Sequence, residues 1–544
     1  MIISISAWYG GRLFKIEQGK PNKIVTAFRK YIVLPATFGG KHAEPNRFCG
    51  LDFNITPLRW MTLLQILYGV LNIIFLWPQV DVFEENSKLG TPAAQWARYI
   101  GDRSGIFCTV MIPSLYAFAG RNNILSYISG WSMATFNVIH RWTGRWMFIQ
   151  AVIHSITYSL VYIYDGGRAS YIEKIWDRIS IVWGTVATIL AGVILVQSAY
   201  PLRHYFYEIF HIFHIALAAV FIPYTYLHIY EYDYYQWYYW KYMWACVGIW
   251  VGDHVLRICR ILYSGLFVTA KTQVFGGSLL MRVKPMIKWP IRPGQYAYLY
   301  IMKYKIWESH PFTLLGVRDG EYYFIMKANA GMTRTIYDRV NRQQGQSKTM
   351  NVWVEGFYGE TFPIFRFNTI VLVAGGVGIT PILNYATEIA RKGRDGQTVI
   401  IHWSTRDDEL IPAVKPFLDD VLASGKIEVH IHVTGPQNGD FGYGSSSEKP
   451  SSVSDMEEGE KSNSLSDASV THTSGALKVL DLQYGKRPQF DEILSNIIHE
   501  APSSVGIFVC APGAMSDVCR KSVTENLDKG NGRVELFEEE FAWA

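Results

Sequence analysis

Six apolar windows dominate the first half of the chain and constrain its fold more than any other feature. They span about residues 58–79, 100–119, 132–164, 178–199, 205–230 and 239–262. A helix that crosses a bilayer needs roughly 20 mostly apolar residues, so each window is long enough. The rest of the 544-residue chain has ordinary globular composition. We therefore predict a transmembrane core of six helices over residues 58–262, followed by soluble domains.

Charge predicts the orientation of this core. Basic residues gather before the first window and after the sixth, whereas the stretch PQVDVFEEN between the first two windows is acidic. Because cytosolic loops are enriched in Lys and Arg, residues 1–57 are predicted to form a cytosolic N-terminal segment. A net charge of +5 without a dominant basic face argues against a nucleic-acid partner. The six cysteines lack the spacing of a zinc site or a disulfide framework.

Four histidines occupy these windows at matched intervals. His140 and His154 are 14 residues apart in the third window, and His214 and His228 repeat that interval in the fifth. Fourteen residues at about 100° each return a side chain to nearly the same helix face, about 21 Å along the axis. The third and fifth helices run in the same direction, so His140 is expected level with His214, and His154 level with His228. We predict that each pair holds one b-type haem through two axial imidazoles; the alternative is a set of hydrogen bonds between helices.

Other polar residues of the windows leave alternatives open. Arg141 and Arg145 fit haem propionates and fit equally well as ordinary cations at a helix boundary. Phe221 lies midway between the two histidines of the fifth window, where core packing is favoured over a bridge between haems. His204 and His211 fall outside the repeated interval and are interpreted as core or interfacial polar residues.

The soluble half begins with a predicted β-barrel. Over residues 264–366 the sequence shows short alternating runs with Gly and Pro breaks, which are typical of short strands. The segment FNTIVLVAGGVGITPIL (367–383) then predicts a buried strand, a glycine turn and a helix. Such a turn lets backbone N–H groups approach a phosphate. Residues 367–544 are accordingly predicted to form an α/β domain.

Three further segments of this α/β domain carry predictions. The strand in VIIHWSTRDDEL (399–410) leads to Arg406, which fits a grip on the ribose 2′-phosphate of NADPH or an ordinary surface arginine. The strand in GIFVCAPGAM (506–515) leads to Cys510, which also fits a small core residue. Residues 436–475 are rich in Ser, Gly and Glu with few large apolar groups, so we predict a disordered insertion there.

Together these motifs resemble the ferric reductase and NADPH oxidase superfamily, with fungal ferric-chelate reductases the most similar. The resemblance rests on the paired histidine intervals, HPFTL (310–314), GGVGITP (375–381), HWSTRDD (402–408) and FEEEFAW (537–543). It implies a multi-domain membrane protein: a six-helix di-haem core, a ferredoxin-reductase-like FAD-binding β-barrel and an α/β NADPH-binding domain. It also implies electron transfer from cytosolic NADPH through FAD and two haems to ferric or cupric chelates on the opposite side, in support of metal uptake.

The resemblance assigns roles to individual residues. Those bordering the flavin ring would be His310, Pro311, Phe312 and Thr313, and those at the FAD pyrophosphate Lys327, Gly331, Met332 and Thr333. Those at NADPH would be Gly376, Gly378, Pro381, Trp403, Arg406 and, beside the nicotinamide, Cys510. The aromatic ring that stacks on the flavin would be that of Phe541, and Trp543 is the second choice. The catalytic candidates are therefore Thr313, Cys510, Phe541 and Trp543.

Two motifs depart from the family pattern without removing an electron-carrying group. The usual Cys-Gly-Pro reads CAPG (510–513), and the usual Val-Glu-Gly-Pro-Tyr-Gly reads VEGFYG (354–359). These changes affect the shape of the predicted nicotinamide pocket and the rigidity of one barrel strand.

The principal alternative within this family is a superoxide-generating NADPH oxidase, and a second is a non-catalytic membrane scaffold. Equal intervals of 14 favour metal reduction, as does Tyr158, which stands where oxidases tend to place a further histidine. The resemblance further implies the plasma membrane, with endoplasmic reticulum or vacuole as alternatives. An iron permease or an oxidase is the partner it implies for the ferrous product.

Overall fold

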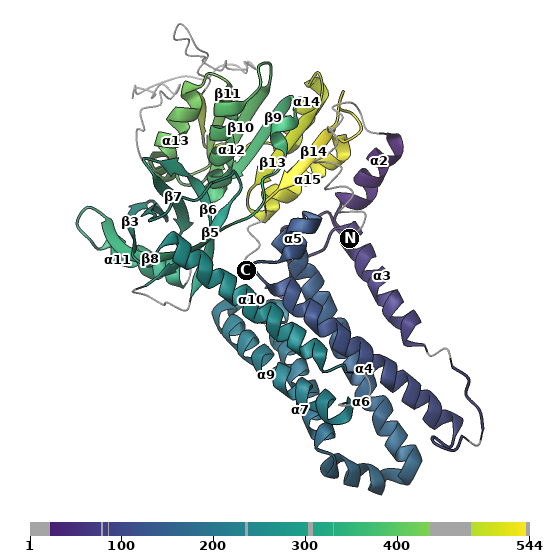
Figure 1. The fold of residues 1–544 in the computed structure, drawn as a ribbon. Helices are drawn as coiled ribbons and strands as arrows, with labels where there is room; N and C mark the ends of the chain where they lie inside the picture. The colour runs from purple at the N-terminus through teal and green to yellow at the C-terminus, as the bar shows by residue number, and fades with distance from the viewer. Residues whose placement is uncertain are drawn as a thin grey trace, which may run out of the picture. The chain divides into compact units, whose positions relative to one another are not determined.

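The computed structural model describes residues 22–77, 80–84, 86–233, 238–302, 308–329, 331–435 and 480–539. They fall into two units (Figure 1). One, here the helical unit, comprises the described residues from 31 to 263. The other, the sheet unit, comprises residues 22–30 and those from 264 onward. The predicted insertion at 436–475, Phe541 and Trp543 lie outside the described residues.

The helical unit contains one long helix for each predicted window. These are α3 (Arg59–Leu76), α4 (Pro92–Ala119), α6 (Met133–Asp177), α7 (Ile179–Gln197), α9 (Tyr207–Asp233) and α10 (Lys241–Ser264). Shorter elements are β1 (Asn46–Phe48), β2 (Leu51–Asn54), α5 (Ile124–Ser129) and α8 (Tyr200–Tyr205), and η1 (Arg29–Val33) begins in the sheet unit and continues into the helical unit. α4 packs along α6 and α7 along α9, so the third and fifth windows each have a neighbouring helix.

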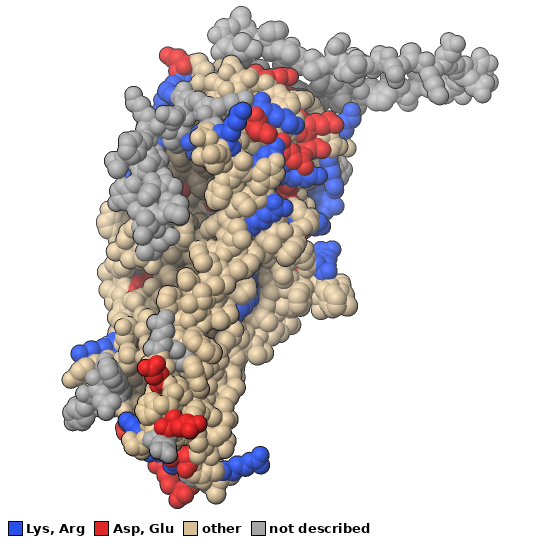
Figure 2. Space-filling view, turned by 90° about the vertical axis from the view of Figure 1, so that its right-hand side faces the viewer, with Lys and Arg blue, Asp and Glu red and all other residues tan. Residues whose placement is uncertain are grey.

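Four helices among the described residues are long and apolar enough to cross a bilayer: α3, Met133–Ala169 within α6, α7, and Tyr207–Tyr232 within α9. α4 and α10 are also long, but charged residues such as Arg98, Asp102 and Asp253 interrupt them. In Figure 2 the lower, helical part of the surface shows few charged side chains between its ends. Exposed apolar side chains include Leu63, Ile66, Leu67, Ile73, Ile189, Val193, Val196, Ile209, Ile212 and Phe213. Such a surface suits lipid rather than water.

The sheet unit begins with the predicted barrel. Six antiparallel strands close in the order β3-β4-β7-β6-β5-β8. Their bounds are β3 (Val268–Phe275), β4 (Ser278–Lys284), β5 (Tyr296–Ile301), β6 (Ser309–Arg318), β7 (Glu321–Lys327) and β8 (Ser347–Tyr358). Helix α11 (Met332–Asn341) joins β7 to β8. Alternate side chains of the strands fill the interior, so the barrel has its own apolar core.

A six-stranded parallel sheet follows, in the order β12-β11-β10-β9-β13-β14. Its strands are β9 (Thr369–Gly375), β10 (Thr398–Thr405), β11 (Ile427–Val433), β12 (Leu480–Tyr484), β13 (Val505–Cys510) and β14 (Val534–Glu538). Its helices are α12 (Ile379–Lys392), α13 (Ile411–Ala423), α14 (Phe490–Glu500) and α15 (Gly513–Asn526), with short η2 (Ile364–Arg366), η3 (Gly376–Gly378) and η4 (Asp408–Leu410). The strand order reverses between β9 and β13, and ligands of such sheets bind beyond the carboxyl ends of the strands at this point.

Candidate functional site

The structure brings the four window histidines together in the two predicted pairs. The ring centres of His140 and His214 are 6.1 Å apart, and those of His154 and His228 are 6.0 Å apart. An imidazole nitrogen bound to a metal lies about 2 Å from it. Two such rings on opposite sides of one ion therefore have centres roughly 6 Å apart, so both pairs have the spacing that one iron requires.

Hydrogen bonds orient these imidazoles. Three of the four histidines are bonded through Nδ1 to a backbone carbonyl of a neighbouring helix: His140 to Leu115 (3.0 Å), His154 to Gly101 (2.8 Å) and His228 to Ser180 (2.7 Å). Nδ1 of His214 instead lies 2.8 Å from Nε2 of Gln197 and 3.1 Å from Oγ of Ser198. A proton donated from Nδ1 leaves Nε2 as the ligand nitrogen, as in most metal-bound histidines. The carbonyl bonds thus fix the tautomer that an axial ligand needs.

Two glycines make room for the second pair. A Cβ atom on Gly105 of α4 would lie 2.7 Å from Nδ1 of His154, and one on Gly184 of α7 would lie 2.6 Å from Nδ1 of His228. Both distances are shorter than any side chain tolerates, so glycine is required for the imidazoles to reach their carbonyls. The residues present fit two haems held by paired histidines.

A polar network adjoins the second pair, and of its residues the sequence analysis named only Tyr158. Tyr158 donates a hydrogen bond to Asp102, which also pairs with Arg98 at 3.0 Å. Arg98 donates to the hydroxyl of Tyr232 at 2.6 Å, and the Tyr158 ring lies 4.7 Å from that of His154. The available signal was spacing, since Tyr158 and Tyr232 each follow a predicted ligand by four residues.

In the sheet unit, the glycine turn lies where the strand order reverses. Gly376 has φ +55° and open space around its Cα, a conformation that favours glycine. A Cβ on Gly375 would lie 2.4 Å from Cδ of Pro512, so this turn packs against the turn that follows β13. The N-cap of α12, Gly378, makes no side-chain bond to the first turn. Backbone N–H groups of that turn therefore remain available to a phosphate.

The predicted nucleotide residues separate into two kinds. Pro381 and Cys510 are buried next to this turn, and Arg406 is exposed in the loop after β10. Trp403 is fully buried, and its Nε1 donates to the carbonyl of Gly376 at 3.0 Å. The Trp403 side chain therefore supports the glycine turn from within the core, and its role at the nucleotide stays a prediction.

The predicted flavin residues lie on β6 and at the start of α11. The run His310, Pro311, Phe312 and Thr313 is half-buried in β6. Lys327 ends β7 and is exposed, and Gly331 has φ +79° at the N-cap of α11, with no side-chain cap. Thr333 and Met332 are buried, and Met332 packs in the barrel core. The place of Met332 beside the pyrophosphate stays a prediction, and a backbone N–H is the group that it would offer there.

Glu539 is a further residue that the sequence analysis missed. Its Oε1 accepts a hydrogen bond from Oγ1 of Thr313 at 3.2 Å, and its backbone N–H donates to Val509 at 3.0 Å. Burial raises the pKa of Glu539 to about 7. Burial also raises the pKa of the Cys510 thiol, and the nearby Glu539 charge adds to the effect. A titratable carboxyl thus joins the two predicted catalytic side chains.

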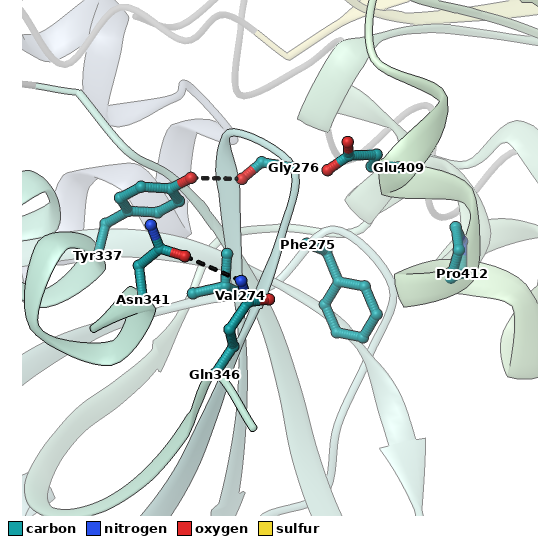
Figure 3. A pocket seen from close by; sticks show the side chains of 8 residues that line it. All are labelled: Val274, Phe275, Gly276, Tyr337, Asn341, Gln346, Glu409 and Pro412. Atoms are coloured by element: carbon teal, nitrogen blue, oxygen red, sulfur yellow. Dashed lines mark hydrogen bonds between the residues drawn. The ribbon is translucent and has the colours of Figure 1, made fainter. Parts of the chain in front are cut away.

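A separate cavity of about 250 Å³ lies between the barrel and the loop that follows β10 (Figure 3). Its lining comprises Val274, Phe275, Gly276, Tyr337, Asn341, Gln346, Glu409 and Pro412. The Tyr337 hydroxyl donates to the carbonyl of Gly276 at 2.9 Å. The lining contains none of the predicted site residues.

Histidine pairs in a membrane core, a closed barrel and a parallel sheet with a glycine turn define a membrane oxidoreductase that uses a flavin and a nicotinamide nucleotide. Comparison with known proteins agrees. Residues 104–225 match the ferric reductase like transmembrane component family, residues 267–362 an FAD-binding domain, and residues 367–524 the ferric reductase NAD binding domain. The chain belongs to the ferric reductase family, and the predicted fold is confirmed.

Fungal relatives match almost the whole chain. A probable ferric reductase transmembrane component of Candida albicans is 30% identical over 96% of this chain and 77% of its own length. Ferric/cupric reductase transmembrane component 2 of Saccharomyces cerevisiae is 29% identical over 96% of this chain and 72% of its own. Among solved structures, a ferredoxin NADP+ reductase from Neisseria gonorrhoeae covers 50% of this chain and 98% of its own at 14% identity, with a TM-score of 0.33. That likeness is too low to support an argument.

Proposed function

We propose that the protein is an NADPH-dependent ferric-chelate reductase that moves electrons across a membrane through two b-type haems. The observation that carries the proposal is the pairing of the four histidines at ring-centre distances of 6.1 and 6.0 Å. Both spacings suit six-coordinate iron, which passes electrons without binding a ligand. The names of the Candida and Saccharomyces relatives, ferric or ferric/cupric reductase, support a ferric or cupric chelate as the acceptor.

The chain's own residues divide the work. His140 and His214 would hold one haem, and His154 and His228 the other. When bound, FAD converts the hydride of NADPH into single electrons, and the haems carry single electrons through the bilayer. The histidines would hold each haem in a fixed position, and their Nδ1 partners favour this by fixing the imidazole rings.

In the sheet unit, the backbone at Gly331 and at Gly376 would bind the pyrophosphates of FAD and NADPH. Arg406, exposed in its loop, would bind the 2′-phosphate that distinguishes NADPH from NADH. Thr313 would hold the Glu539 carboxyl beside Cys510, where the nicotinamide is proposed to lie. A carboxylate there stabilises the positive charge that the nicotinamide ring gains when it loses hydride.

We further propose domain limits of 1–57, 58–262, 264–366 and 367–544, and residence in the plasma membrane. A relative from Aspergillus oryzae named as a probable cell surface ferric reductase supports the location. An iron permease or an oxidase is the proposed partner for the product. Imaging of the tagged protein tests the location, and endoplasmic reticulum or vacuolar signal would contradict it.

The experiment that tests the acceptor uses intact cells that express the protein. They should reduce an impermeant ferric chelate at the surface, and superoxide dismutase should leave the rate unchanged. The alternative product is superoxide. Tyr158, with its hydroxyl bonded to Asp102, argues against it because a neutral phenol is a weaker partner for an oxygen anion than a histidine. Loss of most chelate reduction on adding dismutase would favour superoxide, and absence of NADPH oxidation by the full-length protein would favour a scaffold.

A further inference from the structure

A short N-terminal segment packs in the sheet unit although the chain continues directly into the helical unit. Helix α2 (Lys23–Phe28), Arg29 and Lys30 group with the sheet unit, and Tyr31 begins the described part of the helical unit. The chain therefore passes between the units at residues 30–31 as well as at residues 263–264. Within the described residues the sheet unit has two points of attachment, and the first depends on side-chain contacts.

Arg29 holds the edge of the parallel sheet. Its NH1 group donates to the carbonyl of Val534 at 3.0 Å, and its NH2 group pairs with Oε1 of Glu535 at 2.9 Å. β14, to which both residues belong, is an edge strand with one neighbour, β13. The Arg29 side chain is only 12% exposed, so the contact excludes water and is stronger than a surface ion pair.

Lys30 makes a second contact a short distance along the sheet unit's chain. Its Nζ donates to the carbonyl of Glu525 at 3.2 Å and pairs with Asp528 at 2.8 Å. Glu525 lies in the last turn of α15 and Asp528 just beyond it. The last carbonyls of a helix lack intrahelical partners and carry partial negative charge, so a cation is favoured there. Two adjacent cations thus bind a strand and a helix of the sheet unit.

These contacts do not hold the catalytic end of β14. At that end Glu538 pairs with Arg520 at 2.8 Å, and the Glu539 N–H donates to Val509. The position of Glu539 is therefore fixed independently of Arg29. What Arg29 and Lys30 fix is the point at which the chain leaves the sheet unit for the helical unit.

We propose that Arg29 and Lys30 form a tether that limits the motion of the sheet unit relative to the helical unit and so sustains electron transfer from the flavin to the membrane haems. The inference rests on the proposed function. Domains joined by one linker move relative to each other by default. A second attachment raises the effective concentration of one unit at the other. Release of the tether should slow the transfer between units and leave the chemistry within the sheet unit intact.

The test compares two rates in full-length holoprotein: reduction of a soluble dye by NADPH, which needs only the sheet unit, and anaerobic reduction of the haems by NADPH. Arg29→Ala/Lys30→Ala should slow haem reduction by about tenfold, as expected from a lost second attachment, and change dye reduction by less than about twofold. Lys23→Ala, at an exposed position of the preceding helix α2, should change neither rate. Arg29→Lys, which keeps a cation opposite Glu535, should retain more haem reduction than Arg29→Ala.

A second readout needs no turnover. With one spin label on each unit, the distance distribution should broaden in Arg29→Ala/Lys30→Ala and remain narrow in Lys23→Ala. Unchanged haem reduction in the double variant would overturn the tether. An equal loss of both rates, which indicates misfolding, would also overturn it, as would an Arg29→Lys variant that reduces the haems no faster than Arg29→Ala. A wild-type protein that reduces dye but binds no haem would instead refute the proposed function.

Discussion

Replacing Glu539 with glutamine should make the sheet unit more stable above neutral pH and less active. The pKa of Glu539 is raised to about 7 by burial, whereas in the unfolded chain it is about 4.3. Between these values the folded chain holds a proton that the unfolded chain has released. Stability is thus fully present below the unfolded pKa and falls as the pH rises toward 7, by up to about 3 kcal/mol. Glutamine is neutral at every pH, so the variant escapes this loss.

Thermal unfolding of the holoprotein measures this change in stability, and the rise in flavin fluorescence on release of the flavin monitors the unfolding. At pH 8 Glu539→Gln should unfold roughly 5–10 °C higher than the wild type, and at pH 4.5 the two should coincide. Because only the carboxylate stabilises a cationic nicotinamide, NADPH oxidation at pH 8 should fall by roughly tenfold, and its rise with pH near 7 should disappear. Equal unfolding temperatures at both pH values would refute the reasoning, because they would mean that the buried carboxyl does not titrate near 7.

Three further predictions concern Gly184, His402 and Arg406. Gly184→Ala places a Cβ 2.6 Å from Nδ1 of His228 and should remove about half of the bound haem. Gly248→Ala, at a position with open space around it, should keep the haem. Equal haem absorbance in the two variants would contradict the assignment of His228 as a ligand. Burial lowers the pKa of His402 to about 3. Below pH 6.5 the unfolded chain therefore binds a proton at His402 that the folded chain does not bind, and the free energy of unfolding falls by ~2 kcal/mol by pH 5. The free energy of unfolding of His402→Leu should fall less than that of the wild type between pH 6.5 and pH 5. The same pH profile in both proteins would contradict the lowered pKa of His402. Arg406→Ala should raise the KM for NADPH roughly tenfold and leave that for NADH unchanged; equal effects on both would rule out 2′-phosphate binding.

The sequence predicted the elements whose cause is local. All six apolar windows form helices, and the segment 367–383 forms β9, η3 and α12 in the expected order. Helix α6 extends beyond its window to Asp177 because two helical stretches join at Gly167, which has φ +73°. Apolar periodicity gives no information about such a junction.

A motif predicts a site residue where it fixes the backbone, whereas the fold decides in which direction a side chain points. Gly331 and Gly376 have the positive φ values that their motifs require, whereas the buried side chains of Trp403 and Met332 follow from which face of their elements meets the core. Glu539 gains its role from Thr313, which is 226 residues away along the chain. No local pattern contains a contact of that separation.

Electron transfer across a sealed membrane tests the central claim most directly. Full-length protein is reconstituted into vesicles that enclose an impermeant ferric chelate, and NADPH is added outside. Only molecules whose sheet unit faces outward can then use the NADPH. Wild-type protein should reduce the enclosed chelate. His154→Leu should abolish this reduction and retain reduction of an external dye, because only the haem of the second histidine pair is lost. Continued reduction of the enclosed chelate by His154→Leu at the wild-type rate would contradict an electron path through the paired histidines.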